Sequence, residues 1–176
     1  MFHVKQLREQ YFKELDAWNK VHRIFGSNRQ EIYKQSVEAL SFLKKEHLDT
    51  TVLVDVGAGA GFLAFAWICE GFGDFAYIVE PSLKPATFMR YFLSTLNPST
   101  RGAFKLVDCR FEDVSRETSS EILEKKPLFC SRAFSSDLSL REIIQISPFS
   151  AEKMHIFKKT VAPLGKTEKY RFIGLN

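Results

Sequence analysis

The segment VLVDVGAGAG at residues 52–61 constrains the fold of this chain more than any other. The apolar, β-branched run over 51–56 is typical of a buried parallel strand, and Gly57, Gly59 and Gly61 follow it before an apolar helical pattern begins at Phe62. Glycines at such a turn permit positive φ angles and let a ligand contact bare main chain. The segment predicts a strand, a tight loop and a helix that together form a cofactor pocket; the alternative is a glycine-rich turn that binds nothing.

The rest of the chain alternates helical and strand patterns. Apolar residues three or four apart predict amphipathic helices over 2–25 and from Asn28, which is placed to cap the second helix. The other expected elements are strands at 51–56, 75–80, 103–107, 127–132, 153–160 and 169–175, and helices at 61–71, 83–96 and 137–146. The last two strands leave no room for a crossover helix, so they predict an antiparallel hairpin at one side of the sheet. The pattern indicates an α/β fold with a mostly parallel sheet of about six strands.

Length and composition indicate an ordinary globular protein. We expect 176 residues to form one domain, with an N-terminal helical extension over 1–47 and the core over 51–176. The net charge of +4 permits nucleic-acid binding without requiring it. Three cysteines without C-x-x-C spacing suggest neither a metal site nor a disulfide framework. Without a signal-peptide pattern or an apolar run of about 18 residues, we expect a cytoplasmic monomer that does not bind membranes.

Glu80 is the second feature that indicates a nucleotide-like ligand. Ligands bind beyond the carboxyl ends of the strands in open parallel sheets, and Glu80 follows the second strand, 19 residues after Gly61. A carboxylate there is suited to accept hydrogen bonds from both ribose hydroxyls of an adenosine group, the alternative being a solvated acid. A dinucleotide loop would have a glycine in place of Phe62, whereas Asp55 before the loop is typical of S-adenosylmethionine-dependent methyltransferases. An NAD-dependent dehydrogenase therefore remains only an alternative.

Five segments, in order, resemble one family, the RsmG (GidB) guanine-N7 methyltransferases of bacterial small-subunit ribosomal RNA. They are WNKVHRIFGSN at 18–28, DVGAGAGF at 55–62, VEPSLKPATFMRYFLSTL at 79–96, CRFEDV at 109–114 and CSRAFSS at 130–136. The resemblance implies a Rossmann-like class I methyltransferase fold, S-adenosyl-L-methionine as cofactor, and 16S ribosomal RNA or the small ribosomal subunit as partner. It implies an enzyme that transfers a methyl group to N7 of a guanine.

The resemblance also implies roles for individual residues. Gly57 and Phe62 would line the methionine side of the cofactor, Glu80 would hold the ribose, and Phe111 and Glu112 would hold the adenine. The remaining implied cofactor residues are Gly59, Gly61 and Arg132, where Arg132 closes the pocket near the substrate. The residues expected to position the substrate are Arg132, Arg110 and, as the counterpart of a family strand-end lysine, Lys158. Apart from the resemblance, the cluster of Lys20, Arg23 and Arg29 beside the pocket-facing helices is expected to contact RNA phosphates. Lys84 on the pocket rim is also suited to phosphate, the alternative being an exposed cation without a ligand.

The chemistry and the departures from the family pattern set the remaining expectations. Guanine N7 has a free lone pair and no proton, so methyl transfer requires alignment more than a base, and no catalytic dyad is expected. The family pattern His-x-x-Asp-Ser on the second helix is replaced here by Ile32 to Ser36, which lacks two polar groups. The alternative function is therefore a relative that binds RNA or the ribosome without turnover.

Overall fold

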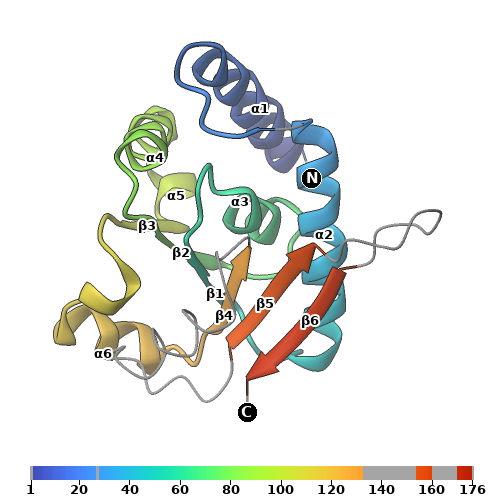
Figure 1. Cartoon of the computed structure of the whole chain (residues 1–176), viewed down its shortest axis with the longest axis vertical. Coiled ribbons are helices and arrows are strands. Elements are labelled where there is room, and N and C mark those ends of the chain that lie inside the picture. The colour runs from blue at the N-terminus through green and yellow to red at the C-terminus, as the bar shows by residue number, and fades with distance from the viewer. Residues whose placement is uncertain (1, 27, 133–153, 160–169, 176) are drawn as a thin grey trace.

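The computed structural model describes residues 2–26, 28–132, 154–159 and 170–175; for 2–4, 132 and the last two strands the description covers the main chain. The six strands among them form one sheet with the order β3-β2-β1-β4-β5-β6 (Figure 1). The strands are β1 (Val52–Val56), β2 (Phe75–Val79), β3 (Phe104–Val107), β4 (Leu128–Arg132), β5 (Met154–Lys159) and β6 (Tyr170–Leu175). All neighbours pair in parallel except β5 and β6, which are antiparallel. The predicted six-stranded sheet with an antiparallel C-terminal pair is confirmed.

The helices surround this sheet on both faces. They are α1 (Phe2–His22), α2 (Arg29–Glu46), α3 (Phe62–Cys69), α4 (Leu83–Thr95), α5 (Pro98–Arg101) and α6 (Arg116–Glu124), with a 3-10 turn at Phe111–Asp113. Figure 1 shows α1 to α4 on one side of the sheet and α6 on the other. The first strand shows why both faces are covered, since Leu53 packs in the core beneath α1 to α4 while Val52 and Val54 pack with Ile122 of α6.

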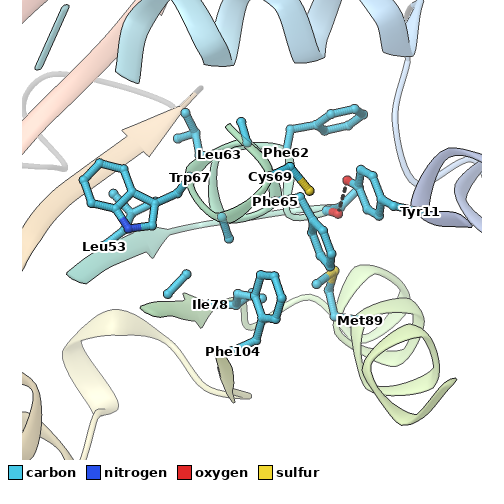
Figure 2. Packing of buried hydrophobic residues seen from close by; sticks show 14 of the residues in the cluster. Tyr11, Leu53, Phe62, Leu63, Phe65, Trp67, Cys69, Ile78, Met89 and Phe104 are labelled. Atoms are coloured by element: carbon cyan, nitrogen blue, oxygen red, sulfur yellow. Dashed lines mark hydrogen bonds between the residues drawn. The ribbon is translucent and has the colours of Figure 1, made fainter. Parts of the chain in front are cut away.

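The larger of the two cores is rich in aromatic rings. Tyr11 of α1 stacks on Phe65 of α3, with ring centroids 4.2 Å apart and an interplanar angle of 9°. Phe65 also stacks on Phe104 of β3 at 4.6 Å, and Trp67 is fully buried. Figure 2 shows these side chains gathered around α3. The aromatic core therefore fixes α1 against the helix that follows the glycine loop.

The helices differ from the sequence expectations in three places, namely the end of the first helix and two short helices that the patterns do not predict. The first helix ends at His22 rather than residue 25, because Arg23 adopts a φ of 49° and its N–H donates back to the carbonyl of Asn19. Asn28 caps the second helix as predicted, since its side chain accepts from the N–H of Gln30. The short helices α5 and α6 were not expected, because neither carries a long apolar stripe. The helix expected at 137–146 lies outside the described residues.

Candidate functional site

The glycine loop lies at the carboxyl end of β1, at the centre of the sheet. Gly57, Gly59 and Gly61 have φ angles of 67°, 57° and 83°, a region that side chains with a Cβ rarely occupy. The N–H groups of Gly57 and Ala58 both donate to the carbonyl of Val79, at 2.9 and 3.1 Å, which ties the loop to the end of β2. The sequence prediction of a strand, a tight loop and a helix is therefore confirmed.

Glu80 holds this loop from the side of β2. Its side chain is buried, and one carboxylate oxygen, Oε2, accepts from the N–H of Gly59 at 2.6 Å. The other oxygen, Oε1, accepts from the N–H of Ser82 at 2.7 Å, at the start of α4. Each carboxylate oxygen has a second lone pair, so these bonds leave acceptor capacity for a ligand hydroxyl. The carboxylate bridges the glycine loop and the helix that follows β2.

Asp55 is a second buried carboxylate at the site. It is the residue before Val56 at the end of β1, and its Oδ2 accepts from the N–H of Ala64 at 3.1 Å. Ala64 lies in the first turn of α3, where helix N–H groups have no partner within the helix and the helix dipole favours a negative charge. Asp55 therefore fixes the start of α3 relative to β1 and places a carboxylate at the floor of the site.

A cavity of about 320 Å³ opens beside these groups. Its lining comes from the end of β1, the glycine loop, the start of α3 and the N-terminal helical region. The lining residues are Ile24, Phe25, Ile32, Asp55, Gly57, Ala58, Gly59, Ala60, Phe62 and Leu63. Three of the predicted cofactor residues, Gly57, Gly59 and Phe62, are thus brought to one cavity. Gly61 lies beside it, where an added Cβ would come within 2.9 Å of the Met89 side chain.

The apolar wall opposite the loop is built by the connection between α1 and α2. The N–H of Phe25 donates to Oδ1 of Asn19 at 3.0 Å, and the Phe25 ring meets Phe62 edge to face with centroids 5.7 Å apart. The sequence patterns do not single out Ile24 and Phe25 as site residues. Their only signal is their place in the segment at 18–28 that resembles the family.

The two residues expected to hold adenine, Phe111 and Glu112, differ in burial. The ring of Phe111 is buried in the core on the α6 face, where it packs against Phe129 at 6.1 Å. Glu112 is partly exposed, and its carboxylate lies 3.9 Å from the guanidinium of the exposed Arg110. Of this pair, Glu112 alone has a partly exposed side chain, and neither residue is among those that line the cavity.

The expected RNA-contacting cations differ in their surroundings. Lys20, Arg23 and Lys84 are exposed. Arg29 pairs with Asp16 at 2.9 Å and its guanidinium lies over a phenylalanine ring of α1 at 5.2 Å, so it already joins α1 and α2. Arg132 ends β4 opposite Phe157 of β5, which is adjacent in sequence to Lys158. The side chains of Arg132 and Lys158 lie outside the described residues.

Two classes of site are not found in the described part of the chain. No group of three or more His, Cys, Asp or Glu side chains within the described residues could hold a metal ion. Among the described helices, none is both long enough and apolar enough to cross a membrane. The cavity beside the glycine loop therefore remains the candidate site of the described chain.

One solved structure, the glycopeptide N-methyltransferase MtfA complexed with sinefungin, is similar with a TM-score of 0.52 and 14% identity, over 70% of this chain and 50% of that chain. At that identity the likeness shows the fold alone, which is the class I methyltransferase fold expected from the sequence.

Curated relatives named "Ribosomal RNA small subunit methyltransferase G" match by sequence. The one from Helicobacter pylori (strain J99 / ATCC 700824) is 29% identical over 137 residues, which cover 77% of this chain and 71% of the relative. The one from Helicobacter pylori (strain ATCC 700392 / 26695) is 32% identical over 51% of each chain. The one from Aliarcobacter butzleri (strain RM4018) is 27% identical over 50% of this chain and 45% of its own length, so the chain spans about half the length of these last two relatives. The family model described as "GidB: rRNA small subunit methyltransferase G" matches residues 4–163, and the chain therefore belongs to the GidB family.

Proposed function

We propose that the cavity beside the glycine loop binds S-adenosyl-L-methionine. The observation that carries this proposal is a loop of three glycines at positive φ, curved around a cavity of about 320 Å³, with Asp55 at its floor and Glu80 bonded to Gly59. Two buried carboxylates suit a ligand with a sulfonium, an ammonium and ribose hydroxyls. NAD fits this site less well, because Phe62 stands where a dinucleotide loop would have a glycine and no Lys or Arg is among the described residues that line the cavity.

We further propose that the chain methylates N7 of a guanine in 16S ribosomal RNA. The names of the curated relatives and of the family support this substrate class. When bound, S-adenosylmethionine would supply an electrophilic methyl group to the free lone pair of N7, with the sulfonium sulfur as the leaving group. No proton is removed, so the residues of the chain need only bind, align and exclude water.

The proposed roles follow from the positions of the side chains. The main chain of the glycine loop and Phe62 would hold the methionine part, Glu80 the ribose and Glu112 the adenine. Ile24, Phe25 and Ile32 would keep water from the methyl group on the opposite wall. The residues proposed to position the guanine or its phosphates are Arg110, Arg132 and Lys158, and those proposed to contact RNA further out are Lys20, Arg23 and Lys84.

We also propose where the protein acts and in which oligomeric state. Because ribosomal RNA is the proposed substrate, we place the protein in the cytoplasm, as a monomer acting on RNA or on the small subunit. We also propose that residues 1–176 act as one methyltransferase domain, since Tyr11 of the N-terminal extension packs in the same core as α3 and α4.

One observation favours a second function. Ile32 lines the cavity at the position where the family pattern has a histidine, so the substrate side of the site is more apolar than that pattern. A relative that binds the cofactor and RNA without turnover would have this character. Cofactor binding with no methyl transfer to any small-subunit RNA would identify it.

Isothermal titration calorimetry tests the cofactor proposal directly. We expect one S-adenosylmethionine to bind per chain and NAD to bind at least tenfold more weakly. Gly59→Ala is the informative variant, because an added Cβ meets no atom within 4 Å but a φ of 57° is strained for alanine. It should weaken cofactor binding through the loop conformation, and tighter binding of NAD than of S-adenosylmethionine would contradict the proposal.

A further inference from the structure

A buried hydrogen bond joins the N-terminal helix to the glycine loop. The Tyr11 hydroxyl of α1 donates to the carbonyl oxygen of Ala60 at 2.6 Å, and both residues are buried (Figure 2). Ala60 is one of the cavity-lining residues and lies between Gly59 and Gly61. A carbonyl in a buried position strongly favours a partner, because water cannot replace a bond that is lost. The bond therefore acts on the part of the loop that faces the cavity.

The Tyr11 ring is held so that its hydroxyl has little freedom to move. Besides the stack on Phe65, it meets Phe62 at 6.0 Å and 81°, and Phe92 of α4 at 5.5 Å and 67°. Phe62 and Phe65 belong to α3, which follows the glycine loop, and Phe92 belongs to α4, which follows β2. The hydroxyl is thus positioned by the same helices whose N-termini border the site, and a shift of α1 must move either the ring stack or the Ala60 carbonyl.

The opposite side of the loop is held by β2. Glu80 accepts from the N–H of Gly59, and Val79 accepts from Gly57 and Ala58. The glycines supply the conformational freedom that lets the loop curve, so the loop needs restraint from outside itself. The two sides together fix it: the sheet binds its N–H groups, and Tyr11 binds a carbonyl.

We propose that Tyr11 is a positioning residue for the cofactor loop, so that the N-terminal helix is part of the cofactor site although Tyr11 does not line the cavity. This inference rests on the proposed function for its ligand. Removing the hydroxyl lets the Ala60 carbonyl and the adjacent glycines depart from the conformation that binds S-adenosylmethionine. Ordering the loop again then makes the free energy of cofactor binding less favourable.

Tyr11→Phe is the test, because phenylalanine keeps the ring stack and removes only the hydroxyl. Tyr33→Phe is the matched control: Tyr33 is also buried, comes from the N-terminal helices and donates at 2.9 Å, but to Glu70 beyond the far end of α3. Calorimetry at a temperature well below both unfolding transitions measures the Kd of S-adenosylmethionine. We expect the Kd to rise about fivefold in Tyr11→Phe and to stay unchanged in Tyr33→Phe.

Amide hydrogen exchange of the free protein gives a second readout that needs no ligand. Residues 57–61 should exchange faster in Tyr11→Phe alone, and residues 69–71 faster in Tyr33→Phe alone. Wild-type Kd and loop exchange in Tyr11→Phe, or equal changes in both variants, would overturn the positioning role. If the wild-type protein fails to bind S-adenosylmethionine, the proposed cofactor is wrong, and loop exchange alone then decides for or against Tyr11.

Discussion

A buried tyrosine from the N-terminal helices forms a hydrogen bond near each end of α3, but the two bonds restrain different parts of the chain. At the loop end, Tyr11 bonds a main-chain carbonyl and Glu80 bonds main-chain N–H groups, beside an open cavity. At the far end, Tyr33 bonds the Glu70 side chain, which also pairs with Arg8 at 3.2 Å. At the loop end, hydrogen bonds therefore hold the main chain of the glycine loop beside the cavity. At the far end, they join side chains from three helical segments.

The glycines at the two ends show the same difference. Gly59 is needed for its backbone conformation, since a Cβ there would meet no atom within 4 Å but would be strained at a φ of 57°. Gly73, beyond the far end, is needed for space, because a Cβ would lie 2.3 Å from both the Thr51 carbonyl oxygen and Trp67 Nε1. We therefore expect substitutions at the loop end to change ligand binding, and substitutions at the far end to change stability.

The largest expected effect is a loss of stability in Gly73→Ala. The new methyl group would force apart Thr51 and Trp67 and break the bond from Trp67 Nε1 to the Thr51 carbonyl, which is 3.2 Å long. We expect the free energy of unfolding, measured with urea, to fall by about 3 kcal/mol. Gly26→Ala is the control, because a Cβ there meets nothing within 4 Å, and it should change stability by less than about 0.5 kcal/mol. Equal stability of the two variants would contradict the packing account.

The next effect, at the loop end, is on binding. Glu80→Gln keeps the shape of the side chain but turns an amide N–H₂ toward the N–H of Gly59 or Ser82, where a donor faces a donor. We expect the Kd of S-adenosylmethionine to rise about 30-fold, which corresponds to about 2 kcal/mol. Glu70→Gln makes the same chemical change at the far end, and calorimetry should find its Kd within twofold of wild type. A similar Kd for both variants would show that the two ends do not differ in function.

Alkaline pH should weaken the far end. Burial, helped by the nearby Glu70, raises the pKa of the Cys69 thiol from 9.0 to about 12. Between these values the folded chain holds a proton that the unfolded chain has lost, so the stability is fully present below pH 9 and falls as the pH rises toward 12. The buried hydroxyl of Tyr33 also has a raised pKa and acts in the same direction.

Urea unfolding at pH 9 and pH 10 measures how much the free energy of unfolding falls over this interval. Cys69 should account for about 1 kcal/mol of the stability lost between the two pH values. Cys69→Ala should therefore lose about 1 kcal/mol less than wild type over that interval, whatever its stability at pH 7. An identical loss in the two proteins would mean that Cys69 is not shielded from ionisation as its burial implies.

The smallest expected effect concerns RNA contacts near the loop end. Lys84 is exposed at the start of α4, two residues after Ser82, whereas Arg29 is paired with Asp16. Lys84→Ala should weaken binding of a small-subunit RNA fragment about threefold and reduce the salt dependence by about one ion. Arg29→Ala should leave the RNA affinity unchanged and lower stability. Fluorescence anisotropy at several salt concentrations would refute this ranking if Arg29→Ala had the larger effect on RNA affinity.

The sequence was sufficient for the centre of the sheet because local patterns encode it strongly. A β-branched run followed by spaced glycines allows few alternatives to a buried strand and a tight loop, and β1 with its loop has that structure. The polar segment RETSSEILE has no such pattern, so α6 could not be foreseen, although Ser115 caps it. The first helix ends three residues early because of the positive φ of Arg23, which an apolar stripe does not reveal.

The site was less predictable because its residues meet only through tertiary packing. Tyr11 belongs to the apolar stripe of α1, and nothing in that stripe indicates that its hydroxyl reaches Ala60. The charge of Arg29 is visible in the sequence, but its partner Asp16 comes from another helix. Likewise, the segment CRFEDV does not distinguish a ring that faces a ligand from the buried ring of Phe111.

The central claim is that this site transfers a methyl group from S-adenosylmethionine to ribosomal RNA. The most direct measurement incubates the protein and methyl-labelled S-adenosylmethionine with small-subunit RNA that lacks the modification, and maps the product by cleavage specific to N7-methylguanine. We predict label at a single guanine, and at a cofactor concentration near the wild-type Kd we expect Glu80→Gln to give less than about a tenth of the wild-type label. No label in RNA, from a preparation that binds the cofactor, would contradict the claim.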